Sequence, residues 1–313
     1  MLSYILKRLL ATVPVLLVVG VFIFLLLRLT PGDPAAMIAG DYATEDQIAA
    51  IKENLGLDKP LIHQFFIWIS NIANGDLGES YFFKKQVTEL IIARIEPTLS
   101  LSVVTIIFTI LIAIPMGVIA AYKQGSWIDR VVMGFSVIGF SIPVFVIGFG
   151  LIYVFSLNLG WFPVQGYQRL EMGVFQWIRH LILPALALSV IFVAFIARMT
   201  RTSVLEVLGE DYVRTARAKG QTETKVLVNH ALRNAAVPII TVIGFAFAIL
   251  IGGVVVTESV FNIPGLGLLT VDAVLNRDFP TIQAVVLLFS FVYVLINLVI
   301  DICYTFLDPR IRY

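Results

Sequence analysis

Six long stretches of this chain carry no charged side chain, and they constrain its fold more than any other feature. A helix needs about 20 apolar residues to cross the roughly 30 Å hydrocarbon core of a bilayer. The predicted helices cover residues 9–27, 97–122, 131–157, 181–197, 234–257 and 279–300. The third stretch stays uncharged beyond its predicted end, but Asn158, Gly160 and Pro163 favour a turn there. The pattern predicts an all-α integral membrane protein with six transmembrane helices.

Composition supports a membrane location and excludes several classes of function. Apolar residues make up 59% of the 313 residues and charged residues 14%, against about 45–50% and 25% in ordinary soluble domains. The net charge of +1 excludes a broad surface for nucleic acid, which would need a surplus of basic residues. A single cysteine, Cys303, excludes an intramolecular disulfide and a thiolate metal cluster.

The distribution of basic residues predicts the orientation in the membrane. An even number of spans places both termini on the same side. Thirteen of the 22 Lys and Arg residues lie on that side, at positions 7, 8, 123, 130, 198, 201, 214, 217, 219, 225, 233, 310 and 312. Because loops rich in Lys and Arg stay in the cytoplasm, we expect both termini and the loop over residues 200–233 to be cytoplasmic.

The chain is expected to comprise four parts, which follow from the lengths of the connections. They are an N-terminal segment with the first helix (1–28), an extracytoplasmic helical region (29–96), a five-helix core (97–303) and a cytoplasmic tail (304–313). Within the second part, Thr44 is the predicted N-cap of a polar helix over residues 45–54. An amphipathic stretch follows over residues 61–72. This region is expected to serve as a cap on the helix bundle, as a docking surface for an external partner, or as both.

The cytoplasmic loop over residues 200–233 has the most informative local pattern. Apolar residues at three- and four-residue spacing predict a helix over 203–219. Gly220 would stop that helix, since glycine adopts the left-handed conformation without steric cost. Thr222 is placed to cap a second helix over residues 223–232. The prediction is two helices joined at a glycine elbow, although a solvated loop without a particular role would show a similar pattern.

The sequence of this elbow resembles the conserved cytoplasmic loop of binding-protein-dependent ABC importer permeases. The similarity covers residues 210–220 and 230–234. In that family a Glu-Ala-Ala triplet stands three residues before an invariant glycine. Here Arg214-Thr215-Ala216 occupies the place of the triplet and Gly220 that of the glycine. The first two positions depart from the pattern, as they do in the peptide-importer branch of the family.

The resemblance implies that this loop receives the ATPase subunits of an importer. The residues expected to form the coupling site are Asp211, Tyr212, Arg214, Thr215, Ala216, Ala218, Lys219 and Gly220. The small side chains of Ala216 and Ala218 are expected to let another protein surface approach the elbow closely.

Further motifs along the chain resemble the B-type permease of dipeptide and oligopeptide importers. They occur at residues 31–34, 75–78, 94–99, 142–145, 161–163, 258–261, 264–267 and 307–313. The resemblance implies a type I ABC importer permease with six spans in the bacterial cytoplasmic (inner) membrane. It also implies transport of short peptides, although permeases for nickel, glutathione and opines look alike.

The same resemblance implies a set of partners. They are a second, homologous permease of the C-type, two cytoplasmic ATP-binding subunits, an extracytoplasmic substrate-binding protein and the surrounding membrane lipid. ATP and magnesium would be bound by the ATPase subunits, and no cofactor or metal is expected on this chain. Residues that line the substrate pathway are not identified by these motifs.

The sequence lacks the motifs that would make the chain an enzyme. It contains no Gly-Lys dipeptide, so a Walker A phosphate loop is absent. His63, His180 and His230 are not part of a His-Glu-x-x-His helix, and Ser141 lacks the second glycine of a nucleophile elbow. An intramembrane enzyme would need a nucleophile and a base on facing helices, and no such pair is evident. A stand-alone channel or secondary carrier stays open, although the spans lack the charged residues that ion-coupled carriers use.

Overall fold

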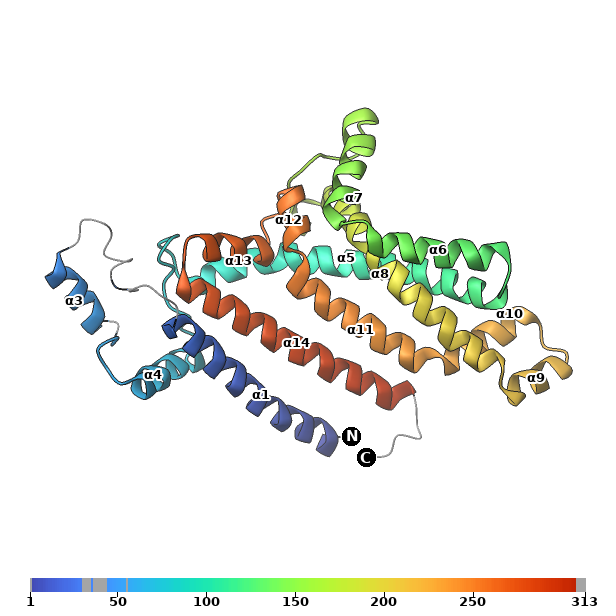
Figure 1. The fold of residues 1–313 in the computed structure, drawn as a ribbon, viewed down its shortest axis with the longest axis horizontal. Coiled ribbons are helices and arrows are strands. Elements are labelled where there is room, and N and C mark those ends of the chain that lie inside the picture. The colour runs from blue at the N-terminus through green and yellow to red at the C-terminus, as the bar shows by residue number, and fades with distance from the viewer. Residues whose placement is uncertain (1, 30–34, 36–43, 55, 308–313) are drawn as a thin grey trace. The chain divides into compact units, whose positions relative to one another are not determined.

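The computed structural model describes residues 2–29, 35, 44–54 and 56–307. Helices account for most of these residues (Figure 1), and the one β-pairing among them is an isolated bridge between Glu79 and Gln86. The chain divides into two compact units. The first comprises residues 1–6, 95–268 and 292–313, and the second comprises residues 7–94 and 269–291. The predicted motif at residues 31–34 and the tail from residue 308 onward lie outside the described residues.

Helix α8 (Val174–Leu208) runs through the core of the first unit. It packs against α6 (Trp127–Ser141) and α11 (Ala236–Gly253). Small residues permit these close approaches. A Cβ built on Gly139 in α6 would lie 3.1 Å from the Cβ of Ala194 in α8, so a larger residue there would push the two helices apart. Close packing through small residues is how helices associate in a membrane, where burial of apolar surface gives little net drive.

Three described helices are long and apolar enough to cross a membrane, and the number rises to six if each of three bent pairs counts as one span. The three are α5 (Val87–Tyr122), α8 and α14 (Phe279–Leu307). They confirm the helices predicted over residues 97–122, 181–197 and 279–300, each as part of a longer helix. Helix α1 (Leu2–Leu29) contains the apolar stretch Leu10–Leu25 at the place of the first predicted span.

The third predicted helix is wrong as a single element. It consists of α6 and of α7 (Val144–Leu151), which continues into the π-helical segment η1 (Ile152–Asn158). The two halves differ in direction by 102°. Pro143 explains the break, because it has no N–H to donate and its ring excludes a helical conformation for Ile142. Ile142 is extended, with φ −92° and ψ 122°.

The fifth predicted helix also ends earlier than expected. Helix α11 stops at Gly253, and the last predicted residues belong to α12 (Val255–Phe261). A glycine pair at Gly252 and Gly253 is a common place for a helix to change direction. After α12, the left-handed residue Asn262 leads into α13 (Leu266–Leu275), at an angle of 94°.

Two helices of the second unit follow the sequence pattern. Helix α3 (Glu45–Asn54) begins with the predicted cap, since the Thr44 hydroxyl accepts from the Gln47 N–H at 3.4 Å and the Gln47 side chain accepts from the Thr44 N–H at 3.0 Å. Helix α4 (Leu61–Ala73) is amphipathic, and its Trp68 ring lies 5.7 Å from the ring of Phe24 in α1.

The start of α14 is tied to the preceding part of the second unit by a buried carboxylate. Asp278 accepts hydrogen bonds from the Ser80 hydroxyl at 2.5 Å and from the Tyr81 N–H at 3.0 Å. It also accepts from the Thr281 hydroxyl at 2.8 Å in the first turn of α14. The aspartate therefore fixes the loop around residue 80 to the beginning of a long apolar helix.

Candidate functional site

The loop over residues 200–233 lies at the end of α8, where α9 (Asp211–Ala218) and α10 (Glu223–Lys225) follow (Figure 1). The continuous helix predicted over 203–219 is wrong, because α8 ends at Leu208 and α9 begins as a separate helix. Between them Glu210 is extended, with ψ 147°. The turn at Gly209 and Glu210 folds α9 back toward the last residues of α8.

A small apolar cluster explains this turn. Val213 and Ala216 of α9 and Val226 beyond the elbow are buried together. Val207 and Leu208, the last residues of α8, pack against them. A straight helix would leave these side chains in water, so their burial favours the bend.

The elbow at Gly220 has the predicted geometry. Its φ is +78°, in the left-handed region, which confirms it as the helix stop. The Gly220 N–H donates to the Arg217 carbonyl at 2.9 Å, and the Gln221 N–H donates to the Ala216 carbonyl at 3.3 Å. This pair of bonds is the Schellman motif, which satisfies carbonyl groups at the end of a helix. A Cβ on Gly220 would meet nothing within 4 Å, so the backbone conformation alone selects glycine there.

The second helix of the loop consists of α10 and the π-helical segment η3 (Val226–Leu232). Thr222 occupies the predicted N-cap position with an extended backbone, but its hydroxyl makes no capping hydrogen bond. Two side-chain contacts hold the helices together instead. The Arg217 guanidinium donates to both carboxylate oxygens of Glu223, at 2.9 and 3.2 Å. A nitrogen of the His230 ring lies 2.7 Å from the Gln221 amide oxygen.

Seven of the eight predicted coupling residues lie on the exposed surface of α9 and of the elbow that follows it. They are Asp211, Tyr212, Arg214, Thr215, Ala218, Lys219 and Gly220. The exception is Ala216, which is buried in the cluster with Val213 and Val226 and is therefore not available to another protein. Arg214 and Asp211 form an exposed contact at 3.4 Å. Partial burial of the Tyr212 phenol, together with the charge of Glu210, raises its pKa. The surface thus combines a neutral phenol with both signs of charge.

An ion pair near the loop was not predicted from the sequence. Arg201, about two turns before the end of α8, donates to both carboxylate oxygens of Asp129 at 2.5 and 2.8 Å. Asp129 also accepts from the Gly125 N–H at 2.9 Å, in the turn that precedes α6. The pair joins α6 to the helix that carries the loop. No sequence signal connects two residues so far apart. Asp129 by itself, three residues after Ser126, is typical of the first turn of a helix.

A second buried carboxylate organises α12 and α13. Glu258 is fully buried, and its two oxygens accept from the Thr98 hydroxyl at 2.6 Å and the Leu268 N–H at 2.9 Å. The Thr98 oxygen in turn accepts from the Leu266 N–H at 2.8 Å, so the first turn of α13 is capped. Gly265 leaves the room for the carboxylate, because a Cβ there would overlap the carboxylate of Glu258. The motifs over 94–99, 258–261 and 264–267 therefore meet in space.

The loop presents an exposed helix surface with both signs of charge. Among the described residues, no three His, Cys, Asp or Glu side chains gather closely enough to hold a metal ion. The ionisable groups of the loop lie on an exposed helix surface beside a rigid elbow. Such a surface is suited to contacts with a partner, while the Asp129–Arg201 pair joins its supporting helix α8 to α6.

The sequence matches a family of transport proteins over nearly its whole length. The family model described as "Binding-protein-dependent transport system inner membrane component" matches residues 113–313, and the model for the N-terminal part of such components matches residues 1–102. The probable peptide ABC transporter permease protein y4tP of Sinorhizobium fredii is 56% identical over 99% of both chains. The glutathione transport system permease protein GsiC of Escherichia coli is 46% identical over the full length of both.

A solved structure shows the same fold at low sequence identity. It is the MetNI methionine ABC transporter in an inward-facing conformation, with a TM-score of 0.58 and 21% identity. The match covers 70% of this chain and 96% of that chain. The all-α membrane fold is therefore that of type I ABC importer permeases, as the sequence predicts.

Proposed function

Since the chain belongs to the family of binding-protein-dependent transport system inner membrane components, we propose that it imports short peptides as the B-type permease subunit of an ATP-driven importer. The observation that carries the peptide assignment is the 56% identity to a probable peptide permease over nearly the whole chain. Glutathione, itself a small peptide, is the second candidate, because a glutathione permease is 46% identical over the full length.

The proposed assembly contains a second, C-type permease, two cytoplasmic ATPase subunits and an extracytoplasmic binding protein. The ATPases would bind ATP and magnesium and supply the energy, because this chain has no Walker A motif. In this assembly the chain itself hydrolyses nothing. Its part is to alternate between two conformations in response to closure of the ATPases.

The loop over residues 200–233, with its elbow at Gly220, is the proposed coupling site. Its support is mechanical. The cluster of Val213, Ala216 and Val226 and the Arg217–Glu223 pair make the elbow a rigid unit on the end of α8. A displacement of α9 by an ATPase would therefore reach α8 rather than dissipate in a loose loop.

The proposed topology has six spans with both termini in the cytoplasm. Its support is the concentration of Lys and Arg on one side of the predicted spans. In this orientation the elbow faces the ATPases, and residues 29–96 face the binding protein or clasp the partner permease.

Reconstitution tests the proposal directly. The complete complex in proteoliposomes, supplied with its binding protein, should accumulate labelled dipeptides only when ATP is present on the ATPase side. Glutathione uptake in the same assay would favour the second candidate. Peptide accumulation without ATP would indicate a channel or carrier, and the absence of uptake for any short peptide would refute the assignment.

A further inference from the structure

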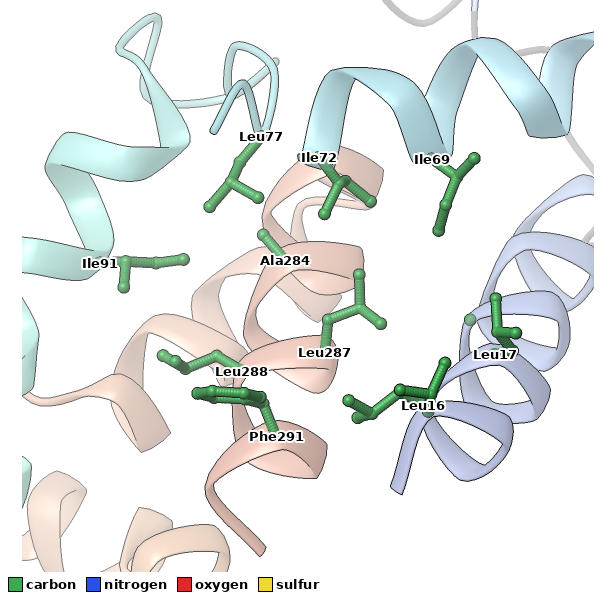
Figure 2. Close-up of a pocket in the computed structure, with 12 residues that line it drawn as sticks. Leu16, Leu17, Ile69, Ile72, Leu77, Ile91, Ala284, Leu287, Leu288 and Phe291 are labelled. Atoms are coloured by element: carbon green, nitrogen blue, oxygen red, sulfur yellow. The ribbon is translucent and has the colours of Figure 1, made fainter. Parts of the chain in front are cut away.

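The second unit contains an apolar cavity of about 400 Å³ among α1, α4, the start of α5 and α14. Figure 2 shows the side chains around it, with Leu16, Ile69, Leu288 and Phe291 arranged about a common space. All twelve lining residues belong to this unit, and each is aliphatic, aromatic or glycine. The cavity therefore offers its contents van der Waals contact and almost no hydrogen bonding.

Water does not suit this space. At a liquid volume of about 30 Å³ per molecule, the cavity would hold about a dozen waters. A buried water needs two to four polar partners, and cavities lined by leucine, isoleucine and phenylalanine stay dry and bind apolar molecules. An unfilled space of this size would also leave its lining side chains without contact atoms on one side. An apolar occupant is the arrangement that these side chains favour.

The dimensions select a thin, flexible occupant. An α-helix with its side chains is at least about 10 Å wide, so 400 Å³ of such a cylinder would be only about one helical turn long. A helix of a partner subunit could therefore enter this open space only with its side chains. A single alkyl chain, which is much narrower and bends freely, would fit.

The surroundings of the cavity provide such chains. Only 11% of the residues in the apolar window of α14 are buried within this chain, so this helix has a face for the bilayer. Helix α4 exposes Ile62 and Phe66, at 73% and 63%, and its Trp68 packs beside Phe24. Tryptophan and exposed apolar side chains on an amphipathic helix are typical of the membrane–water interface. Lipid chains are therefore the apolar groups that would surround α4 and α14 in a bilayer.

We propose that this cavity binds one acyl chain of a membrane phospholipid, held between α1 and α14 beneath α4. The phospholipid would act as a structural ligand of this unit. The proposal is independent of the transported substrate, since none of the lining residues belongs to the coupling elbow.

Paired substitutions on α1 test the site. Leu17→Trp places a large side chain at a residue that lines the cavity, and Val18→Trp places the same side chain on its exposed neighbour, which does not line it. The complete importer complex, carrying either variant or neither, would be delipidated in detergent and exposed to dioleoyl phosphatidylglycerol. Native mass spectrometry then counts the phospholipids that stay bound.

We expect Leu17→Trp to retain one phospholipid fewer per complex than the unsubstituted protein, and Val18→Trp to retain the same number. Gly20→Leu is a second cavity variant, since a Cβ there meets only the Trp68 ring at 3.8 Å, and Gly134→Leu in α6 is its control. Equal counts in all variants would overturn the proposal. Loss of the partner permease from the Leu17→Trp complex but not from the Val18→Trp complex would also overturn it, because the space would then hold side chains of that partner.

Discussion

Gly220 and Glu258 fix local geometry for different physical reasons. Gly220 has open space around it, and its constraint is a left-handed backbone. Glu258 has no space to spare, and its constraint is the set of donors that surround its buried carboxylate. The first residue was predicted because a helix stop is a local event. The role of the second depends on Thr98 and Leu268, which only the folded chain brings to it.

Gly220→Val should abolish transport and substrate-stimulated ATP hydrolysis while the chain still inserts into the membrane. A β-branched residue in the left-handed region is strained by about 1–2 kcal/mol, which is enough to shift an elbow but too little to unfold the chain. Gly220→Asn is the control, because asparagine adopts this conformation more readily. If both variants couple normally in proteoliposomes, the elbow conformation does not matter for coupling.

Glu258→Gln should lower the melting temperature of the purified complex. The amide keeps one acceptor oxygen but turns its NH₂ group toward either the Thr98 hydroxyl or the Leu268 N–H, and an unsatisfied buried donor costs about 1–3 kcal/mol. Ser259→Ala is the matched control on the same helix, since that exposed hydroxyl bonds only to the carbonyl of Val255. Equal melting curves for the two variants would show that the buried carboxylate contributes little.

At the scale of elements, the sequence predicts where helices occur better than where they bend. An uncharged stretch of 20 residues has few alternatives to a helix in lipid, because every backbone group must be paired within the segment. A bend depends on what the next segment packs against. Pro143 was visible in the sequence, but the 102° turn that follows it, and the folding of α9 onto Val207, are set by tertiary contacts. The Asp129–Arg201 pair escaped prediction for the same reason.

The Asp129–Arg201 ion pair should transmit movement from α8 to α6. Asp129→Asn and Arg201→Gln should each reduce substrate-stimulated ATP hydrolysis while the ATPases still copurify with the permease. A double-mutant cycle on stability should give a coupling of about 1.5–3 kcal/mol, the range for hydrogen bonds to charged groups. Arg130→Gln, a change at an exposed neighbour whose charge acts on Asp129 more weakly than that of Arg201, should have a much smaller effect. If the stability changes of the two single variants add up to that of the double variant, the two helices are not coupled through this pair.

At the scale of the whole molecule, the proposed topology places α3 and the coupling elbow on opposite sides of the membrane. Cysteine at Glu45, in a Cys303→Ser background, should react with a membrane-impermeant maleimide added to intact cells. Cysteine at Thr224 should react only in inverted vesicles. Both positions are exposed in the structure, so access across the membrane decides the outcome. The reverse pattern of labelling would show that the orientation in the membrane is opposite to the proposed one.

The unbroken length of α8 has a mechanical consequence. Thirty-five residues at about 1.5 Å each make a rod of about 52 Å, well beyond the roughly 30 Å of hydrocarbon. One end carries the elbow, and near the other Trp177 donates to the Ser100 hydroxyl. In the proposed topology, a small tilt of α8 at the cytoplasmic face becomes a sideways shift of several ångströms at the opposite face, and Pro184 is the interior point of α8 that lacks a backbone hydrogen-bond donor. In the proposed assembly, α8 alone would carry a movement of the ATPase subunits across the membrane, without a chain of intermediate contacts.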